Sequence, residues 1–419
     1  EGRLAMRLTI AERLKSEFTA TQSKRYDTYS VNLTTDRDPK IFDDKVRDYL
    51  IQESSNPGLI KEVNDYLDSI GYTASRYTWE QIKTQLLRFS EPNVPSKATN
   101  PHFISAKREM LNEFSKLRLK ALSFNSEMDY RDVCPKTDAH AGFSYIITGM
   151  KEKGDYLETL HLTYPIEEAE ARVNKSWNKP ILAGARTQAS GAYDEEDDMK
   201  ETGTFKHKSR LVNMMDIYQI YGELKFSKPV QDAMRHMSWY AGGKDDDRIY
   251  SETRHMSKLG GYWITIDYSH YDQSVSEWLI YEAFDIVRAA FDNEGFDDEL
   301  FRICVNDFIH KVFLGPNGKL IESHKGIPSG SMFTQIIGSI VNRLMVTTFL
   351  HSKGINRYSM MIMGDDNLIF TNSEIDRASL SGYLQHNFGV TMHPDKCSGG
   401  KCEGDYLFLS RWWNRAGSY

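Results

Sequence analysis

The chain has 419 residues, of which 40% are hydrophobic and 26% are charged, and its formal net charge is -7. This length exceeds one small core and predicts two or three subdomains in a soluble globular protein. The net negative charge argues against nonspecific nucleic-acid binding over the whole surface but is compatible with a locally basic channel. Four cysteines form no dense disulfide framework, which favours a reducing compartment. No apolar run is long enough to span a membrane, so we expect no membrane partner.

Residues 1–130 are polar, biased toward helix and rich in Lys, Arg, Glu and Tyr. Apolar residues recur at helical spacing over Ile60–Ile70 and Trp79–Phe89, so we expect helices there. This part contains no chemical motif, and we interpret it as a support that wraps the remainder of the chain.

Small residues mark the next segment, Thr137–Gly142, ahead of an aromatic and β-branched run. They would let another backbone, of protein or of nucleic acid, approach closely. A plain loop into a strand is the competing interpretation, and the local pattern favours it.

A basic cluster follows, in which Lys206, Lys208 and Arg210 alternate along the chain. Alternate side chains of a strand point to the same side, so these cations would lie in a row. Such a row suits the phosphates of an incoming nucleoside triphosphate. A solvated edge strand is the alternative, and the cluster taken alone favours it, because charge runs are usually solvated.

The short apolar segment Trp263–Ile266 predicts a buried strand that ends at Asp267. Packing explains a carboxylate there poorly, because buried Asp is rare unless it is paired or metal-bound. Asp267 is therefore a functional candidate. Asp272 lies five positions later and could equally be an N-terminal residue of the next helix, which we expect over Val275–Phe291.

The centre Pro316-Asn317-Gly318 predicts a hairpin, and the Gly- and Ser-rich loop 326–330 then opens a long apolar helix near Ser331. Backbone N–H groups of such a loop can meet a phosphate or a sugar. Thr334 and Asn342 are eight positions apart and lie close to one helix face. A lone buried Asn is usually a hydrogen-bonded core residue, which is the favoured alternative to ligand binding.

The segment Tyr358–Thr371 predicts a second hairpin, in which two apolar runs flank Gly364-Asp365-Asp366. Two adjacent carboxylates repel each other unless a cation lies nearby. Mg²⁺ is the usual partner, because it takes carboxylate oxygens and keeps positions open for waters and phosphates. An Asp-rich solvent turn is an equally weighted alternative on this stretch alone.

Beyond this hairpin we expect a helical stretch within 372–398, followed by Lys396 in a turn and a final aromatic strand over 404–413. A lone Lys normally faces solvent. The nearby histidine and cysteines do not have the spacing of a typical zinc site; they are His393, Cys397 and Cys402.

The order of these segments resembles the palm of a viral RNA-directed RNA polymerase. The segments are the basic strand, the Asp267–Asp272 segment, the Ser-Gly loop with its helix (GIPSGSMFTQIIGSIVN) and the MGDDN hairpin. The resemblance covers about residues 131–413 and is most similar to polymerases of double-stranded RNA viruses, the picobirnaviruses first and the partitiviruses second. It implies an α+β right-hand polymerase with fingers and palm, in which helices flank an antiparallel palm sheet and the thumb is largely missing from this chain.

The resemblance also implies a division of the chain. Residues 1–130 would form an N-terminal and fingers support region, and 131–255 the fingers with the template loop and the basic segment through which nucleotides enter. Residues 256–413 would form the palm, with 290–325 as a fingers-side insertion, and 414–419 would begin a truncated thumb.

For the site, the resemblance implies that Asp267 and Asp365, with Asp366 close by, hold two Mg²⁺ ions, for which Mn²⁺ can substitute. Lys396 would be the general acid that protonates the leaving pyrophosphate. The phosphates would be bound by Lys206, Lys208 and Arg210. The ribose and the nucleotide would be bound by Asp272, Ser329, Gly330, Thr334 and Asn342. The loop Thr137–Gly142 would guide the template.

The resemblance implies template-directed RNA synthesis that replicates and transcribes a viral RNA genome. The partners would be RNA template and product, ribonucleoside triphosphates and a viral capsid protein, in the virion interior and the host cytoplasm. A non-catalytic RNA-binding or capsid-associated protein is one alternative. A P-loop ATPase is another, but GPNGKL lacks the first glycine and the Ser or Thr of that motif. Asp at 272, where a reverse transcriptase-like palm would have an aromatic gate, speaks against DNA synthesis.

Overall fold

The structure is a computed structural model of the chain. It describes residues 58, 61–62, 73–74, 79–123, 136–145, 149–156, 179–186, 189–190, 210–258, 260–315, 318, 320–403, 405–414 and 417–418. Lys206, Lys208 and most of the helix expected over 60–70 lie outside the described residues.

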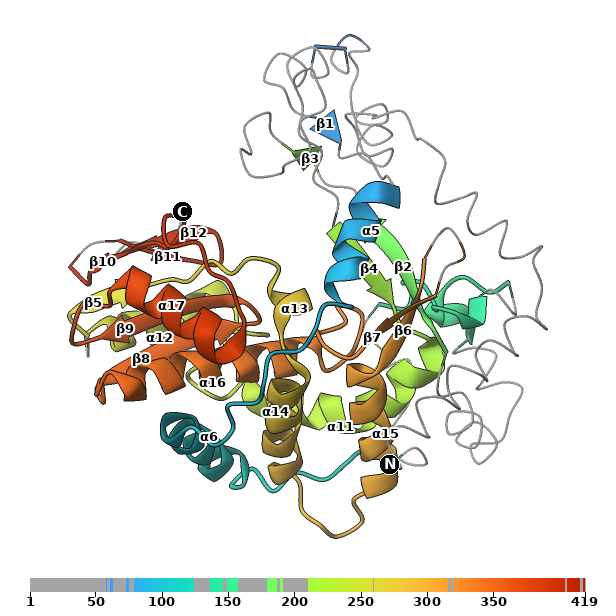
Figure 1. The fold of residues 1–419 in the computed structure, drawn as a ribbon, viewed down its shortest axis with the longest axis horizontal. Helices are drawn as coiled ribbons and strands as arrows, with labels where there is room; N and C mark the ends of the chain where they lie inside the picture. Colours follow the sequence, from blue (N-terminus) through green and yellow to red (C-terminus); the bar gives the residue numbers. More distant parts are fainter. Residues whose placement is uncertain are drawn as a thin grey trace.

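An antiparallel sheet carries the acidic hairpin, with strand order β10-β5-β9-β8. The strands β8 (Tyr358–Met363) and β9 (Asp366–Thr371) pair directly across Gly364-Asp365, which confirms the predicted hairpin. Beside β9 lies β5 (Tyr262–Ile264), and β10 (Gly399–Lys401) forms the edge. Figure 1 shows this sheet with α17 (Arg377–Phe388) beside it, at one end of the molecule.

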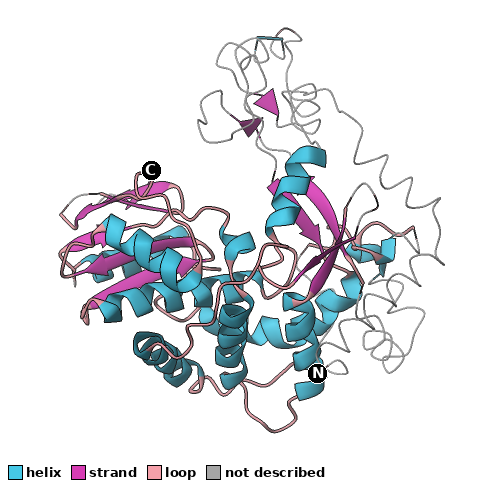
Figure 2. Cartoon of the chain, viewed as in Figure 1, coloured by secondary structure: helices cyan, strands magenta, loops and turns pink. Residues whose placement is uncertain are grey.

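A second sheet has strand order β4-β2-β6-β7 and lies at the other end of the described core (Figure 2). It contains β4 (Arg210–Met214), β2 (Ile181–Arg186), β6 (Lys311–Leu314) and β7 (Leu320–Ser323). The β6–β7 pairing confirms the second predicted hairpin, and a parallel β2–β6 pairing attaches it to this sheet.

The expected final strand over 404–413 is wrong, because the segment folds back on itself. It forms β11 (Tyr406–Phe408) and β12 (Arg411–Asn414), which pair antiparallel, and β12 also pairs with β13 (Gly417–Ser418). Leu409 and Ser410 take φ angles of 52° and 59°, the left-handed values that a tight two-residue hairpin turn requires. The apolar run hid this turn, since neither residue is the Asn, Asp or Gly that two-residue turns with positive φ favour. A further short pair joins β1 (Thr73–Ala74) to β3 (Ala189–Ser190).

Helices pack between and beneath the two large sheets (Figures 1 and 2). The predicted helices are confirmed with shifted ends: α5 (Trp79–Arg88), α14 (Glu277–Ala289), α16 (Thr334–Ser352) and α17. Further helices among the described residues are α6 (Pro101–Phe114), α11 (Ile217–Met234), α12 (Asp246–Ser257), α13 (Tyr271–Ser274) and α15 (Asp298–Ile309).

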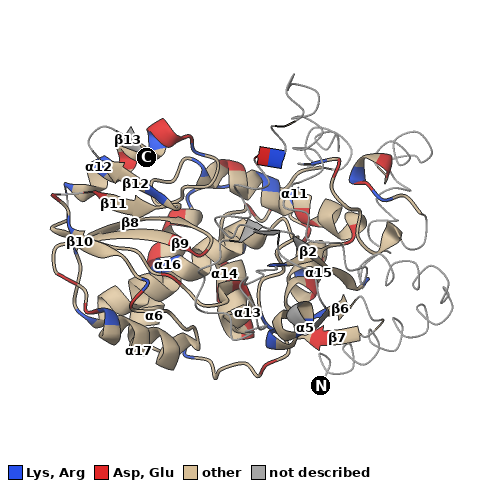
Figure 3. Cartoon of the chain, turned by 90° about the horizontal axis from the view of Figure 1, so that it is seen from above, with Lys and Arg blue, Asp and Glu red and all other residues tan. Residues whose placement is uncertain are grey.

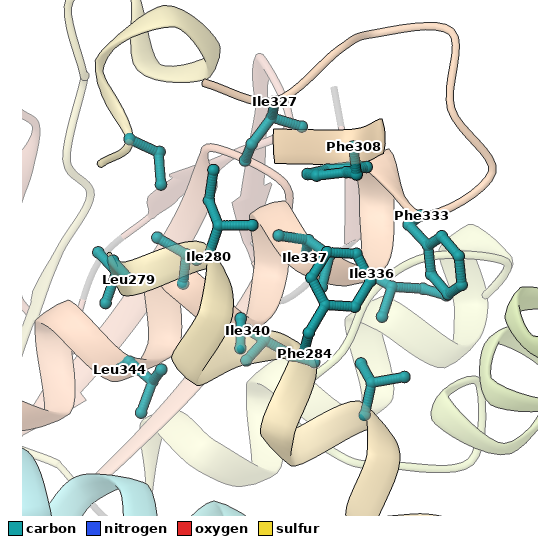
Figure 4. Packing of buried hydrophobic residues seen from close by; sticks show 14 of the residues in the cluster. Leu279, Ile280, Phe284, Phe308, Ile327, Phe333, Ile336, Ile337, Ile340 and Leu344 are labelled. Atoms are coloured by element: carbon teal, nitrogen blue, oxygen red, sulfur yellow. The ribbon is translucent and has the colours of Figure 1, made fainter. Parts of the chain in front are cut away.

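The core is centred on α16, which is buried from Ile336 to Leu350. In Figure 4 the aliphatic side chains of this helix meet those of α14, and a ring cluster closes the core at one side. Phe284 lies 5.2 Å from Phe308 and 5.1 Å from Phe333 between ring centroids, in edge-to-face contacts. Because α16 is covered on every side, its polar side chains must find partners within the protein.

Candidate active site

The tip of the acidic hairpin is held by α16. Gly364 takes a φ of +63°, and a Cβ there would lie 3.0 Å from the side chain of Gln335. Its N–H donates to Ser339 Oγ (2.8 Å), and its carbonyl accepts from Asn342 Nδ2 (2.9 Å). The same amide donates to the carbonyl of Asp365 (3.0 Å). The turn that carries the two carboxylates is therefore bound to the most buried helix of the fold.

Asp267 lies three residues beyond the end of β5, so the strand is shorter than the predicted Trp263–Ile266. Strand β5 pairs with β9 as far as Ile264↔Ile369, and beyond this pair the Ile266 N–H donates to the Asn367 side chain (2.9 Å), which keeps the segment of Asp267 beside the start of β9. Burial of its carboxyl and the charges of Asp365 and Asp267 raise the pKa of Asp366 to about 6. The three carboxylates thus lie within electrostatic reach of one another.

Asp272 joins the same cluster from the first turn of α13. Burial first, and then the charge of Asp365, raise the pKa of Asp272 to about 7. Its backbone carbonyl accepts from Ile327 N–H (2.6 Å), which ties this segment to the Ser-Gly loop. The structure thus agrees with the interpretation of Asp272 as a residue at a helix start, while its role toward the ribose stays a prediction.

Arg210 opens β4 and is exposed. Its positive charge acts against the rise in the pKa of both Asp272 and Asp366, so the guanidinium lies within electrostatic reach of the acidic cluster. The strand register sets Arg186 opposite Arg210. Of the three basic residues predicted to bind phosphates, only Arg210 lies among the described residues. Figure 3 shows acidic positions close to β9 and α16 in the middle of the molecule.

The Ser-Gly loop packs against β4. The N–H of Asn213 donates to Ser329 Oγ (3.2 Å), and a Cβ on Gly330 would lie 1.9 Å from the carbonyl oxygen of Asn213. Thr334 Oγ1 donates to the carbonyls of Pro328 (2.6 Å) and Ser331 (2.8 Å). Ser329, Gly330 and Thr334 therefore shape this loop, and their role toward a nucleotide stays a prediction.

Asn342 is fully buried, and its amide is already engaged within the protein. Besides its two bonds to the hairpin tip, its Oδ1 accepts from Tyr268 OH (2.9 Å). The favoured interpretation of a hydrogen-bonded core residue agrees with these bonds, while the ribose role stays a prediction.

Lys396 follows a turn that is bound to the segment of Asp267. The N–H of His393 donates to the Asp267 carbonyl (3.1 Å), and the N–H of Lys396 donates to the His393 carbonyl (3.0 Å). Cys397 Sγ donates to the same carbonyl (3.2 Å). The turn thus places Lys396 on the side of the sheet end where the acidic cluster lies, although its function is untested.

The loop Thr137–Gly142 meets another protein backbone. Gly142 takes a φ of +78°, and a Cβ there would lie 2.2 Å from the carbonyl oxygen of Met215. The Ile217 N–H donates to the Ala141 carbonyl (2.9 Å). The small residues are thus explained by this close approach, and guidance of a template stays a prediction.

The chemistry of the acidic cluster fits a divalent cation. Its donors are carboxylate oxygens, the ligands that Mg²⁺ prefers, and burial together with the neighbouring charges of Asp365 and Asp267 raises the pKa of Asp366. Within the described residues, no group of three or more His, Cys, Asp or Glu side chains is arranged to hold a metal ion as it stands.

Two residues of this region were missed by sequence reasoning, Ser339 and Asn367. Both are buried, at 0% and 2% exposure, and both bind the backbone at the hairpin tip. Each is a polar residue inside an apolar element, and this pattern could have pointed to it. For Asn367 the pattern is ambiguous, because Asn next to a tight turn is also a common turn residue.

An antiparallel sheet whose adjacent strand ends bring carboxylates together, beside an arginine and a Ser-Gly loop, defines the palm of a right-hand polymerase. The family profile described as viral RNA-dependent RNA polymerase matches residues 59–419. The chain belongs to this family, and the predicted resemblance is confirmed.

Relatives and a solved structure agree with this assignment. The chain is 33% identical over 172 residues to the RNA-directed RNA polymerase of Cryptosporidium parvum virus 1 (strain KSU-1), over 38% of this chain and 31% of that protein. It is 32% identical over 255 residues to the genome polyprotein of human parechovirus 2 (strain Williamson), over 60% of this chain and 11% of the polyprotein. The alignments thus span about a third of the first relative and about a tenth of the second.

The fold is similar to that in the crystal structure of an insertion loop deletion mutant of the RNA-dependent RNA polymerase of a human picobirnavirus. The TM-score is 0.65 at 16% identity, and the match covers 93% of this chain and 77% of that chain. This likeness confirms the predicted α+β polymerase fold, while the predicted domain boundaries are untested. Among the described residues, no helix is both long and apolar enough to cross a membrane.

Proposed function

We propose that this chain synthesises RNA on an RNA template by two-metal nucleotidyl transfer, with release of pyrophosphate. The observation that carries the proposal is the gathering of Asp267, Asp365 and Asp366 at adjacent strand ends, where burial and then the charges of the other two carboxylates raise the pKa of Asp366 to about 6. Two divalent ions bound there would lower the pKa of the primer 3′-hydroxyl and stabilise the leaving pyrophosphate.

The chain's own residues would bind and orient the nucleotide around that cluster. Arg210, which lies within electrostatic reach of Asp272 and Asp366, would pair with triphosphate oxygens, and Lys206 and Lys208 would extend the cationic row. Lys396 would donate a proton to the pyrophosphate as it leaves.

Selection of ribose would depend on the polar groups beside the acidic cluster. Asp272 is held next to the Ser-Gly loop by the Ile327 N–H, and the Ser329 hydroxyl belongs to the same loop. A network of this kind satisfies a 2′-hydroxyl and leaves polar groups unpaired when a deoxynucleotide binds. Thr334, Gly330 and Asn342 would maintain the shape of this network.

We also propose RNA template and product strands as partners, a viral capsid protein as a further partner, and activity in the virion interior and the host cytoplasm. These proposals follow from the resemblance to polymerases of double-stranded RNA viruses and from the viral names of the relatives.

The direct test is incorporation of labelled ribonucleotides on an RNA template with Mg²⁺ or Mn²⁺. We expect Asp365→Asn to abolish incorporation while folding and RNA binding are kept, because the substitution removes a metal-binding charge and little volume. Asp247→Asn, at an exposed position in the first turn of α12, is the matched control and should behave as the wild type. Full activity of Asp365→Asn would contradict the metal role.

A further inference from the structure

The hydrogen-bond ladder between β5 and β9 stops just before the acidic cluster. The last pair is Ile264↔Ile369, and the same register continued would set Ile266 opposite Asn367. On the other edge of β5, the Thr265 N–H continues the pairing with β10 by donating to the carbonyl of Ser398 (2.8 Å). The backbone pairing with β9 therefore ends before Asp267, while the pairing with β10 goes on.

The side chain of Asn367 fills the place of the missing rung. Its Oδ1 accepts from the Ile266 N–H (2.9 Å), and its Nδ2 lies 3.5 Å from the Ile266 carbonyl oxygen. The same Nδ2 donates to the carbonyl of Asp365 (3.1 Å). With 2% of its surface exposed, Asn367 makes these bonds away from solvent. One short amide thus connects the residue before Asp267 to the backbone of Asp365.

The geometry points to Asn367 as a positioning residue that sets the separation between Asp267 and the Asp365–Asp366 pair, and hence the affinity of the site for divalent ions. The inference rests on the proposed function, because it assumes that these carboxylates share metal ions. An amide suits the place, since it offers a donor and an acceptor on a stem of one carbon. Alanine would leave backbone groups of Ile266 unpaired and let the two strand ends drift apart.

A second, longer bridge runs beside it. Tyr268 OH donates to Asn342 Oδ1 (2.9 Å), and Asn342 Nδ2 donates to the same Asp365 carbonyl (3.0 Å). The segment of Asp267 is thus braced on both sides, at Ile266 and at Tyr268. Removing the Asn367 bridge should therefore weaken the binding of divalent ions without unfolding the site, because the Tyr268–Asn342 bridge remains.

The experiment measures Mn²⁺ binding to the intact chain by electron paramagnetic resonance, without RNA or nucleotide, together with thermal unfolding and the Mg²⁺ dependence of RNA synthesis. The variants are Asn367→Ala, the milder Asn367→Ser and, as a matched control, Asn387→Ala. Asn387 is a buried amide on α17 that donates to the Tyr383 carbonyl (2.9 Å). Supporting residues of metal sites typically contribute about 10- to 100-fold in metal affinity or activity.

We expect Asn367→Ala to raise the Kd for Mn²⁺ by about 10-fold or more and to raise the half-saturating Mg²⁺ concentration, with a smaller change in KM for nucleotides. Asn367→Ser should fall between it and the wild type, and it carries the test if the alanine variant does not fold. Asn387→Ala should lose stability and keep its Mn²⁺ affinity. Unchanged Mn²⁺ affinity in folded Asn367 variants would overturn the inference, even if synthesis slows. A wild type that binds Mn²⁺ at this cluster and makes no RNA would instead contradict the proposed function.

Discussion

The side-chain amide of Asn342 donates to the backbone carbonyl of Asp365 across 3.0 Å, from the centre of a fully buried helix to the tip of the acidic hairpin. The bond positions a carboxylate through its own backbone and leaves the side-chain oxygens free to meet other groups. The same amide binds the Gly364 carbonyl, so the turn has little freedom relative to α16.

This arrangement separates the expected effects of two substitutions. Asp272→Ala should relax discrimination against deoxynucleotides by about 10-fold or more, because a polar partner of the ribose is lost while the hairpin tip is unaffected. Asn342→Ala should also relax discrimination, but with a loss of about 1–3 kcal/mol in the free energy of unfolding, because buried backbone carbonyls lose their donor. Competition between ribonucleotides and deoxynucleotides, with urea unfolding of each variant, measures both effects. Unchanged sugar preference in both variants would remove the ribose assignment.

Gly330 offers a test of the Ser-Gly loop. Gly330→Ala would place a Cβ 1.9 Å from the Asn213 carbonyl oxygen, so the loop must move away from β4. We expect a loss of about 1–3 kcal/mol in stability, together with a lower rate of nucleotide incorporation. Gly382→Ala is the matched control, because a Cβ in this helix meets nothing within 4 Å, and it should stabilise by about 0.5–1 kcal/mol. Equal effects of the two substitutions would show that the contact with Asn213 is unimportant.

Glu223 should make the stability of the protein depend on pH. It is fully buried on α11 and accepts from Ser331 Oγ and Met332 N–H, both at 2.8 Å, just before the start of α16. Burial raises the pKa of Glu223 from its ordinary 4.5 to about 8, with a smaller contribution from the charge of Asp307. The folded protein therefore keeps a proton that the unfolded chain has already released above pH 4.5. Stability should fall as pH rises toward 8, with a slope of up to about 1.4 kcal/mol per pH unit for this group.

Glu223→Gln provides the check, since it keeps an acceptor for both donors and cannot ionise. We expect its free energy of unfolding to fall less steeply between pH 5 and 8 than that of the wild type, in urea titrations at several pH values. Part of the slope should persist, because burial also raises the pKa of Asp307 to about 7. Glu223→Ala should destabilise at every pH, since it leaves both donors unpaired. Identical pH slopes for Glu223→Gln and the wild type would contradict the assigned pKa.

The hairpin that carries Asp365 and Asp366 was predictable because its turn and its flanking apolar runs are local. The same holds for the β6–β7 hairpin and for α14, whose periodic patterns lie within a few turns of chain. The hairpin at Leu409-Ser410 escaped prediction, because its turn residues resemble the strands around them. The order of the segments then indicated a polymerase palm, which the family match confirms.

Sequence alone determined which residues carry charge and in what order they occur along the chain, and from this the family followed. Only the tertiary structure decided that the segment of Asp267 comes to lie beside the strand of Asp366 and that Arg210 lies within electrostatic reach of Asp366 and Asp272. It alone showed that the Asn367 side chain bridges the backbone of Ile266 and the backbone of Asp365. The physical reason is that period and turn chemistry act over neighbouring residues, whereas strand register and the pairing of buried polar groups depend on segments about a hundred positions apart.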